Sequence, residues 1–322
     1  MNAKHNFYSY MIAFLFLLSG VTTAGAITPE ELASICEVME SSIVDVSLEY
    51  EWFNIPPWTA EEAKAEMGVK MLIVKEGIRR FKFSAAGLLS NSDPNDPNSP
   101  QFDRLLLEES TTIVTEDGNS WDNVIKQSYN GSFGKSLIIG GWPQETRTGI
   151  ISKKKPPISP ILSPLGFSVL RFIIDDVTDK LPLSVILRRY KELVCLDSTV
   201  EKANGFNTIR ADLLQEWTKQ VCMRVYFSVD HAYTPVRYEY MNGGKPSLTI
   251  EVDSLEKVAK GLWFPSGGFI ISDGRERVDA FQTISKTIVN QGLTDEHFDI
   301  DFPVGTEVRD DIKNTKYIVK PK

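Results

Sequence analysis

Apolar and polar residues alternate along much of this chain, which is the pattern of half-buried β-strands. An early run carries its apolar side chains on one side, at Val44, Val46, Leu48, Tyr50 and Trp52. The alternation returns over residues 221–229, 236–241 and 248–252, and short turns separate these segments. We therefore expect antiparallel strands joined by tight turns, continued by strands at 262–271 and 278–289.

Helical spacing is predicted at the start of the chain and in its middle. Thr28 and Glu31 have the spacing of a capping box, and Pro29 suits a first helical turn. Apolar residues then follow at i, i+3, i+4 and i+7, namely Leu32, Ile35, Cys36 and Met39. This pattern predicts a short amphipathic helix that covers an apolar surface. Two more helices, over 165–177 and 183–194, are expected to pack on the sheet.

Turn residues divide the rest of the chain. Lys75, Glu76 and Gly77 separate two apolar runs, 69–74 and 78–83, which predicts a hairpin. Residues 138–200 contain a glycine- and proline-rich irregular part, and we expect an insertion there. At the end of the chain, Phe298, Ile300 and Phe302 alternate with acidic residues before Pro303 and Gly305. This predicts a closing strand followed by a turn.

The first residues have the features of a cleavable export signal. Lys4 precedes a nearly continuous apolar run, and Ala24, Gly25 and Ala26 fit a small-residue cleavage site. We expect residues 1–26 to be a signal peptide cleaved after Ala26 and the mature chain, 27–322, to form a single domain in the periplasm or outside the cell. No later apolar run is long enough for a transmembrane segment, so none is expected in the mature chain.

Charge and cysteine content exclude several kinds of site. The formal net charge of −8 argues against nucleic acid or an anionic membrane surface as the main partner. The three cysteines, Cys36, Cys195 and Cys222, match no zinc spacing, so we expect no metal site and no cofactor. Three cysteines allow three pairings, and the sequence does not choose among them.

The order of these motifs resembles that of the LolA/LolB-like superfamily of lipoprotein-sorting proteins. Similar elements are the Gly68–Lys75 run leading to Arg80–Phe83, the Asp117-Gly118 turn before Trp121, the Val225–Arg237 strand and turn, and the Phe298–Val308 end. The resemblance covers about residues 28–135 and 205–311. Glu76 and Gly77 stand where the carriers usually have an arginine, which favours a divergent secreted relative over the lipoprotein shuttle itself.

The resemblance implies an α+β fold in which a curved antiparallel sheet forms an incomplete β-barrel covered by helices. It further implies an exported, non-enzymatic protein that holds lipid, acyl chains or a lipidated protein on the concave face, with a role in lipid or lipoprotein trafficking in the cell envelope. Candidate ligand-binding residues, each of which also fits a plain core position, are Tyr50, Trp52, Leu72, Val74, Phe81, Phe83, Val225 and Phe227.

Two other classes of function have some support in the sequence. Asp230 with His231, and His297 with its neighbouring aspartates, could form acid–base pairs, but no catalytic motif accompanies them, so we expect no enzyme. Alternatively, the exposed sheet edges could dock an envelope protein partner without lipid. The sequence does not identify the ligand, the partner or the oligomeric state.

Overall fold

The computed structural model describes residues 27–55, 73–74, 78–87, 104–114, 119–141, 144–153, 172–174, 179–273 and 278–321. The chain divides into two compact units: unit 1 comprises Met1–Ser42 and Leu165–Pro265, and unit 2 comprises Ile43–Pro164 and Ser266–Lys322. The expected signal peptide and its cleavage site lie outside the described residues. The expectation of a single domain stays a prediction.

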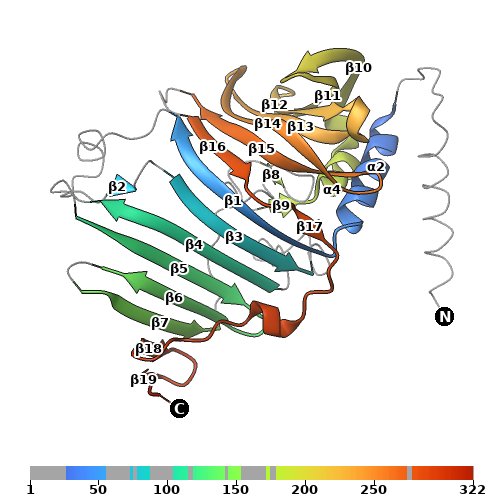
Figure 1. The fold of residues 1–322 in the computed structure, drawn as a ribbon. Coiled ribbons are helices and arrows are strands. Elements are labelled where there is room, and N and C mark those ends of the chain that lie inside the picture. Colours follow the sequence, from blue (N-terminus) through green and yellow to red (C-terminus); the bar gives the residue numbers. More distant parts are fainter. Residues whose placement is uncertain are drawn as a thin grey trace, which may run out of the picture. The chain divides into compact units, whose positions relative to one another are not determined.

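Unit 1 is built on an antiparallel meander in which consecutive strands pair with one another (Figure 1). Its strands are β10 (Val194–Ala203), β11 (Phe206–Leu214), β12 (Val221–Ser228), β13 (Thr234–Asn242) and β14 (Lys245–Ala259). Its helices are α2 (Pro29–Ser41), α4 (Leu183–Arg189), and the short 3-10 helices η4 (Lys191–Leu193) and η5 (Val229–His231). A separate two-stranded ribbon pairs β8 (Phe172–Ile174) with β9 (Asp179–Leu181).

The meander has one apolar and one charged face. Ala211, Val225, Tyr238 and Ile250 lie opposite one another on adjacent strands and are all buried. Helix α2 packs on this face, since Met39 and Cys36 lie near Thr234 and Tyr238 of β13. Side chains alternate along a strand, so the neighbouring residues, such as Asp212, Arg224 and Glu239, point to the other face. These residues belong to a lattice of opposite charges.

The beginning of α2 follows from its sequence as predicted. The hydroxyl of Thr28 accepts a hydrogen bond from the backbone N–H of Glu31 (3.2 Å), and the Glu31 carboxylate accepts one from the Thr28 N–H (2.8 Å). Pro29 occupies the first turn, where its missing N–H is not needed. Leu32, Cys36 and Met39 are buried, so the predicted apolar stripe is the packed side of the helix.

Unit 2 is a larger sheet in the spatial order β15–β16–β1–β3–β4–β5–β6–β7–β18–β19 (Figure 1). These strands are β15 (Leu262–Ser272, shared with unit 1), β16 (Val278–Thr283), β1 (Asp45–Ile55), β3 (Ile78–Ala86), β4 (Arg104–Val114), β5 (Ser120–Tyr129), β6 (Gly134–Gly140), β7 (Thr146–Ser152), β18 (Glu307–Asp310) and β19 (Thr315–Ile318). Two short strands, β17 (Ile288–Val289) and β2 (Ile73–Val74), pair with β1 and β4. All pairings are antiparallel except the parallel pairing of β7 with β18.

The sheet of unit 2 also has two distinct faces. One row of register partners consists of Tyr50, Phe81, Glu109, Ile125 and Ile138. The adjacent row points the opposite way and consists of Glu49, Lys82, Glu108, Lys126, Leu137 and Gly149. We call the first side the aromatic face and the second the charged face. Ion pairs on the charged face join Lys82 to Glu49 (3.5 Å) and Lys126 to Glu108 (2.7 Å).

The C-terminal segment crosses the charged face at β6 and β7. Lys135 pairs with Asp299 (2.6 Å) and donates a hydrogen bond to the carbonyl of Ile300 (3.1 Å). A side chain on Gly149 would collide with the Phe302 ring, because a Cβ there would lie 2.8 Å from it. Phe298 and Ile300 are buried. The glycine therefore creates the space into which the end of the chain packs.

The predicted fold class is confirmed: the protein is α+β, with an open, twisted antiparallel sheet and few helices. The closing strand at 298–302 is wrong, because the 3-10 helix η6 (Asp295–Phe298) and an unpaired extended segment stand there before β18. The helix expected over 165–177 is wrong at Phe172–Ile174, which is strand β8. The helix expected over 183–194 ends at Arg189 and is followed by η4. Ile73 and Val74 pair with β4, where the expected hairpin would have paired them with 78–83.

Candidate functional site

A cluster of aromatic rings occupies one end of the aromatic face in unit 2. Tyr50 and Phe81, direct register partners on β1 and β3, stack with ring centroids 4.9 Å apart. Trp52 stacks on Phe281 of β16 at 6.5 Å, and Phe83 lies two residues from Phe81 on the same side. All five side chains are buried. Stacked rings at these distances contribute attraction beyond their buried area, so this end of the face is a packed core.

The same face opens progressively toward β6. Across the strands, the row that begins with Tyr50 and Phe81 continues through Ile125, which is half-buried, to Ile138, which is 42% exposed. Leu107, opposite Phe83 on β4, is also half-buried. Three strand spacings of about 4.8 Å separate Phe81 from Ile138, so the row spans roughly 14 Å. The face is thus closed at one end and accessible at the other. Glu109 lies in the same row, between Phe81 and Ile125.

One ion pair interrupts the apolar surface at its middle. Arg79 Nη1 lies 3.8 Å from Glu109 Oε1, and the arginine side chain is 46% exposed while that of the glutamate is 21% exposed. Burial raises the pKa of Glu109 above its usual value, and the charge of Arg79 opposes this shift. Burial, followed by the nearby Glu109 carboxylate, raises the pKa of Tyr50. The cation is the more accessible partner, so it is the charge available to an incoming group.

The structure brings together half of the residues singled out from the sequence. Tyr50, Trp52, Phe81 and Phe83 form the aromatic cluster. Val225 and Phe227 are buried on β12 of unit 1. Leu72 and the side chain of Val74 lie outside the described residues.

Sequence reasoning missed the open end of the face. Leu107, Ile125 and Ile138 lie in segments where apolar residues come in runs, such as Leu105–Leu107, so alternation did not mark their faces. Arg79 and Glu109 were missed because only the pairing of β3 with β4 places them near each other. The cross-strand register, which the sequence does not give, was the signal needed.

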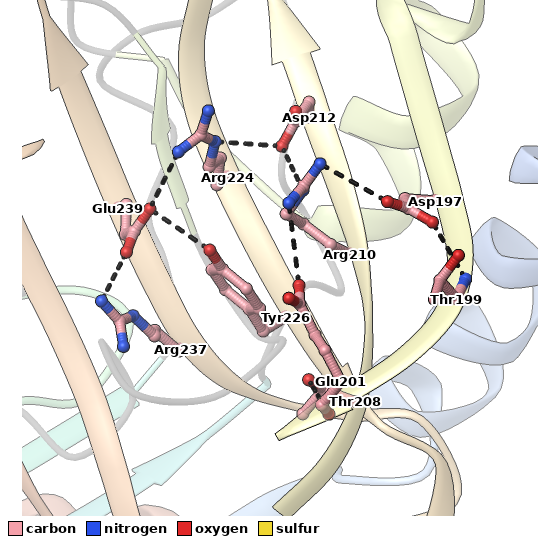
Figure 2. A network of polar contacts seen from close by, with 10 residues as sticks. All are labelled: Asp197, Thr199, Glu201, Thr208, Arg210, Asp212, Arg224, Tyr226, Arg237 and Glu239. Atoms are coloured by element: carbon pink, nitrogen blue, oxygen red, sulfur yellow. Dashed lines mark hydrogen bonds and ion pairs between the residues drawn. The ribbon is translucent and has the colours of Figure 1, made fainter. Parts of the chain in front are cut away.

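A lattice of opposite charges covers the charged face of unit 1. Figure 2 shows that Arg210, Arg224 and Arg237 alternate with carboxylates across β11, β12 and β13. The Asp212 carboxylate lies between Arg210 Nε (3.1 Å) and Arg224 Nε (3.2 Å). Glu239 lies between Arg224 (3.6 Å) and Arg237 (2.5 Å), and the Tyr226 hydroxyl donates to it (3.4 Å).

The positive charges of this lattice are balanced within the lattice itself. Asp197 and Glu201 pair with Arg210 from β10, and Glu251 pairs with Arg237 from β14. Arg237 also lies over the Tyr226 ring, 5.5 Å from its centroid. Because each guanidinium already faces two or more carboxylates, the lattice holds five strands in register and offers no uncompensated cation to a ligand.

The residues considered for acid–base chemistry have other partners. His231 Nδ1 shares a hydrogen bond with the Ser228 hydroxyl (2.8 Å), while Asp230 accepts one from Asn207 (2.8 Å). The ring of His231 is enclosed edge-on by Phe206 and Trp263. Near His297, Asp295 pairs with Arg104 and Asp299 with Lys135. These contacts fix turns and the C-terminal segment.

The three cysteines are free thiols. Cys36 is buried on α2, and burial raises the pKa of its thiol well above the usual range. Cys195 and Cys222 lie on β10 and β12 with β11 between them. Two strand spacings exceed the roughly 7 Å limit for bridged Cα atoms, so this pair does not form a disulfide without backbone movement. Among the residues that the structure describes, no cluster of His, Cys, Asp and Glu side chains could hold a metal ion.

Comparison with solved structures found low-identity matches along most of the chain. The crystal structure of a putative outer membrane lipoprotein-sorting protein domain from Vibrio parahaemolyticus is 11% identical, with a TM-score of 0.41, covering 84% of this chain and 95% of that one. A LolA superfamily protein from Nitrosomonas europaea is 8% identical, with a TM-score of 0.35, covering 86% and 99%. A DUF1329 family protein from Desulfovibrio piger is 10% identical, with a TM-score of 0.41, covering 84% and 95%.

In structure, the chain is similar to LolA superfamily proteins. Similarity at these TM-scores is a likeness of fold and supports no assignment of ligand or partner. No protein-family model and no curated protein matches the chain. In the part of the chain that the structure describes, no helix has the length and apolar character needed to cross a membrane.

Proposed function

We propose that this protein is a non-enzymatic binding protein of the cell envelope whose aromatic face in unit 2 holds an acyl chain of a lipid or of a lipidated protein. The observation that carries this proposal is the row from Tyr50 and Phe81 to Ile125 and Ile138, which is closed at one end and accessible at the other. An alkyl chain laid on the accessible end of this row, at Ile125 and Ile138, would remove apolar surface from water, which is the main source of affinity for such ligands.

The charge distribution agrees with an amphiphile as the ligand. Arg79 stands beside the apolar row and is the more exposed member of its pair with Glu109. A carboxylate or phosphate headgroup could take the place of Glu109 at this guanidinium while its alkyl chain follows the row toward Ile138. The rings at Tyr50 and Phe81 are covered by the chain itself, so a ligand that reached them would first displace that cover.

Adjacent residues on β6 offer a matched pair of variants for the test. Ile138 points to the aromatic face and Ile139 to the opposite one, since side chains alternate along a strand. We expect Ile138→Ser to weaken the binding of a fluorescent fatty acid by about tenfold, given the usual free energy of burying one aliphatic side chain. We expect Ile139→Ser to leave it unchanged.

Lipid extraction from protein purified without detergent provides an independent measurement. The proposal predicts acyl lipids in stoichiometric amount by mass spectrometry of the extract. A lipid-free protein that also fails to bind the fluorescent fatty acid would refute the proposal. A stoichiometric protein partner recovered without lipid would instead favour the docking function considered from the sequence.

A further inference from the structure

The last two strands form a hairpin with an unusual exposure pattern. We call residues 307–320, which comprise β18, β19 and the two residues after them, the terminal hairpin. On β18 buried and exposed residues alternate, and Val308 is fully buried. On β19 all four residues, Thr315–Ile318, are exposed. Within the described residues β19 pairs with β18 alone, so both of its faces and one edge are open.

The hairpin is nevertheless held firmly. β18 pairs in parallel with β7, and the Asp310 carboxylate accepts hydrogen bonds from the backbone N–H groups of Ile312 (3.0 Å) and Lys313 (2.9 Å), which fixes the turn. Beyond β19, Val319 donates to the carbonyl of Thr306 (3.0 Å) and accepts from the N–H of Gly305 (2.9 Å). The exposed side chains are therefore displayed by an ordered scaffold.

Apolar and basic side chains are interleaved on this scaffold. Ile312, Tyr317 and Ile318 are 41%, 44% and 61% exposed. Lys313, Lys316 and Lys320 are exposed among them. Residues 312–320 contain no acidic side chain, whereas Glu307, Asp310 and Asp311 precede them, and Lys313 Nζ lies 3.9 Å from Asp310 Oδ2. The chain as a whole carries a formal net charge of −8, so this positive segment contrasts with the rest of the molecule.

We propose that the terminal hairpin docks the protein on an anionic lipid surface. A membrane interface presents negative headgroups directly above an apolar layer, so it can satisfy lysines and neighbouring aliphatic and aromatic side chains at once. A second copy of the chain fits less well, because pairing residues 312–320 of two copies would bring two sets of three lysines together without a carboxylate between them. This proposal concerns unit 2 alone and does not depend on ligand binding by the aromatic face.

Vesicle co-sedimentation tests the proposal with the full chain. Vesicles of phosphatidylcholine mixed with phosphatidylglycerol should bind the protein, pure phosphatidylcholine should bind it weakly, and added salt should reduce binding. The attraction of one lysine to an anionic leaflet corresponds to about fivefold in affinity. The variant with Lys313, Lys316 and Lys320 changed to Gln should therefore lose about a hundredfold.

Two further variants separate charge, apolar contact and folding. Changing Lys202, Lys219 and Lys245 to Gln removes the same charge from exposed positions of unit 1 and should leave vesicle binding nearly unchanged. Ile318→Ser keeps the charge and should weaken binding about tenfold through lost apolar contact. Circular dichroism and thermal unfolding of each variant verify that the fold is retained.

Several results would overturn the proposal. These are the absence of binding to anionic vesicles, or binding that the hairpin lysine variant does not alter. Binding to soluble poly-glutamate as strong as to vesicles, unaffected by Ile318→Ser, would assign the hairpin to an acidic protein. A concentration-dependent dimer that Ile318→Ser abolishes would assign it to a second copy.

Discussion

The carboxylate of Glu40 in α2 lies against the first turn of α4, where it accepts hydrogen bonds from the backbone N–H (2.8 Å) and the hydroxyl of Ser184. Both side chains are buried. Burial raises the pKa of Glu40 to about 8, the hydrogen bonds from Ser184 oppose the shift, and the nearby Glu37 carboxylate adds to it. Two helices of unit 1 are thus joined through a buried carboxyl group with a raised pKa.

This group should make stability depend on pH. Its pKa in the folded state is above its ordinary value of 4.5, so the folded protein binds more protons than the unfolded chain between about pH 4.5 and 8. The free energy of unfolding should therefore fall as pH rises through this window, with a slope of at most about 1.4 kcal/mol per pH unit, and level off above it. Urea unfolding at a series of pH values measures the slope.

Substitution isolates the contribution of Glu40. Glu40→Gln imitates the protonated carboxyl and should flatten the pH profile. Glu37→Gln should keep the slope but end it at a slightly lower pH, because the Glu37 carboxylate adds a smaller part than burial to the raised pKa of Glu40. A slope that persists in Glu40→Gln would show that another group is responsible.

Asp45 is expected to secure a distant turn. Its buried carboxylate accepts hydrogen bonds from the backbone N–H groups of Gln291 (2.7 Å), Gly292 (2.8 Å) and Leu293 (3.2 Å). Asp45→Asn keeps only one acceptor oxygen and should cost about 2 kcal/mol, and Asp45→Ala should cost more because all three N–H groups lose their partner. Chemical denaturation measures both. Asp122→Asn on β5, whose exposed pair with Thr112 is peripheral, should change stability by less than about 0.5 kcal/mol.

Arg224 should be the most sensitive member of the lattice in unit 1. Its removal leaves Asp212 and Glu239, with side chains 14% and 5% exposed, without the cation between them. We expect Arg224→Met to cost about 2 kcal/mol at neutral pH, less than at a fully buried pair, and less still under acid conditions that protonate the carboxylates. For comparison, Arg309→Met breaks an exposed pair with Asp311 and should change stability by under about 1 kcal/mol.

Gly149 and Phe302 should be energetically coupled. Gly149→Ala places a methyl group against the Phe302 ring and should cost about 1–3 kcal/mol through overpacking. The same change in a Phe302→Ala background should cost less, because the ring is absent. A double-mutant cycle gives the coupling energy, and purely additive costs would contradict the packing seen here.

The sequence predicted individual helices and strands better than it predicted which strands pair with one another. The capping box at Thr28 and the alternation from Val46 to Trp52 are local signals, and both are confirmed. The alternation is wrong at Val44, which precedes β1 and is 60% exposed. Phe298 and Ile300 are buried as their alternation suggested, yet they form no strand, because the segment crosses the charged face and pairs with no neighbour there. Alternation predicts which side chains of a segment are buried. It does not predict which part of the protein buries them.

The candidate site shows the same limit. Tyr50 and Phe81 were identified because aromatic residues stood out within alternating runs. Their continuation through Ile125 to Ile138 depends on the register of four strands, which is set by contacts far apart in the sequence. The parallel pairing of β7 with β18 was equally unreadable, because nothing local distinguishes it from an antiparallel pair.

The long-range pairings of unit 2 have a consequence for biosynthesis. β1 pairs with β16 and β17, which come more than 200 residues later in the chain. Asp45, the first residue of β1, accepts a hydrogen bond from the backbone N–H of Gly292. β7 pairs with β18, near the end of the described residues. During translation, β1 and β7 therefore leave the ribosome long before the strands with which they pair have been synthesised. We expect the nascent chain to stay unfolded until its final segment emerges, which would leave it open to chaperones and to threading through a narrow pore.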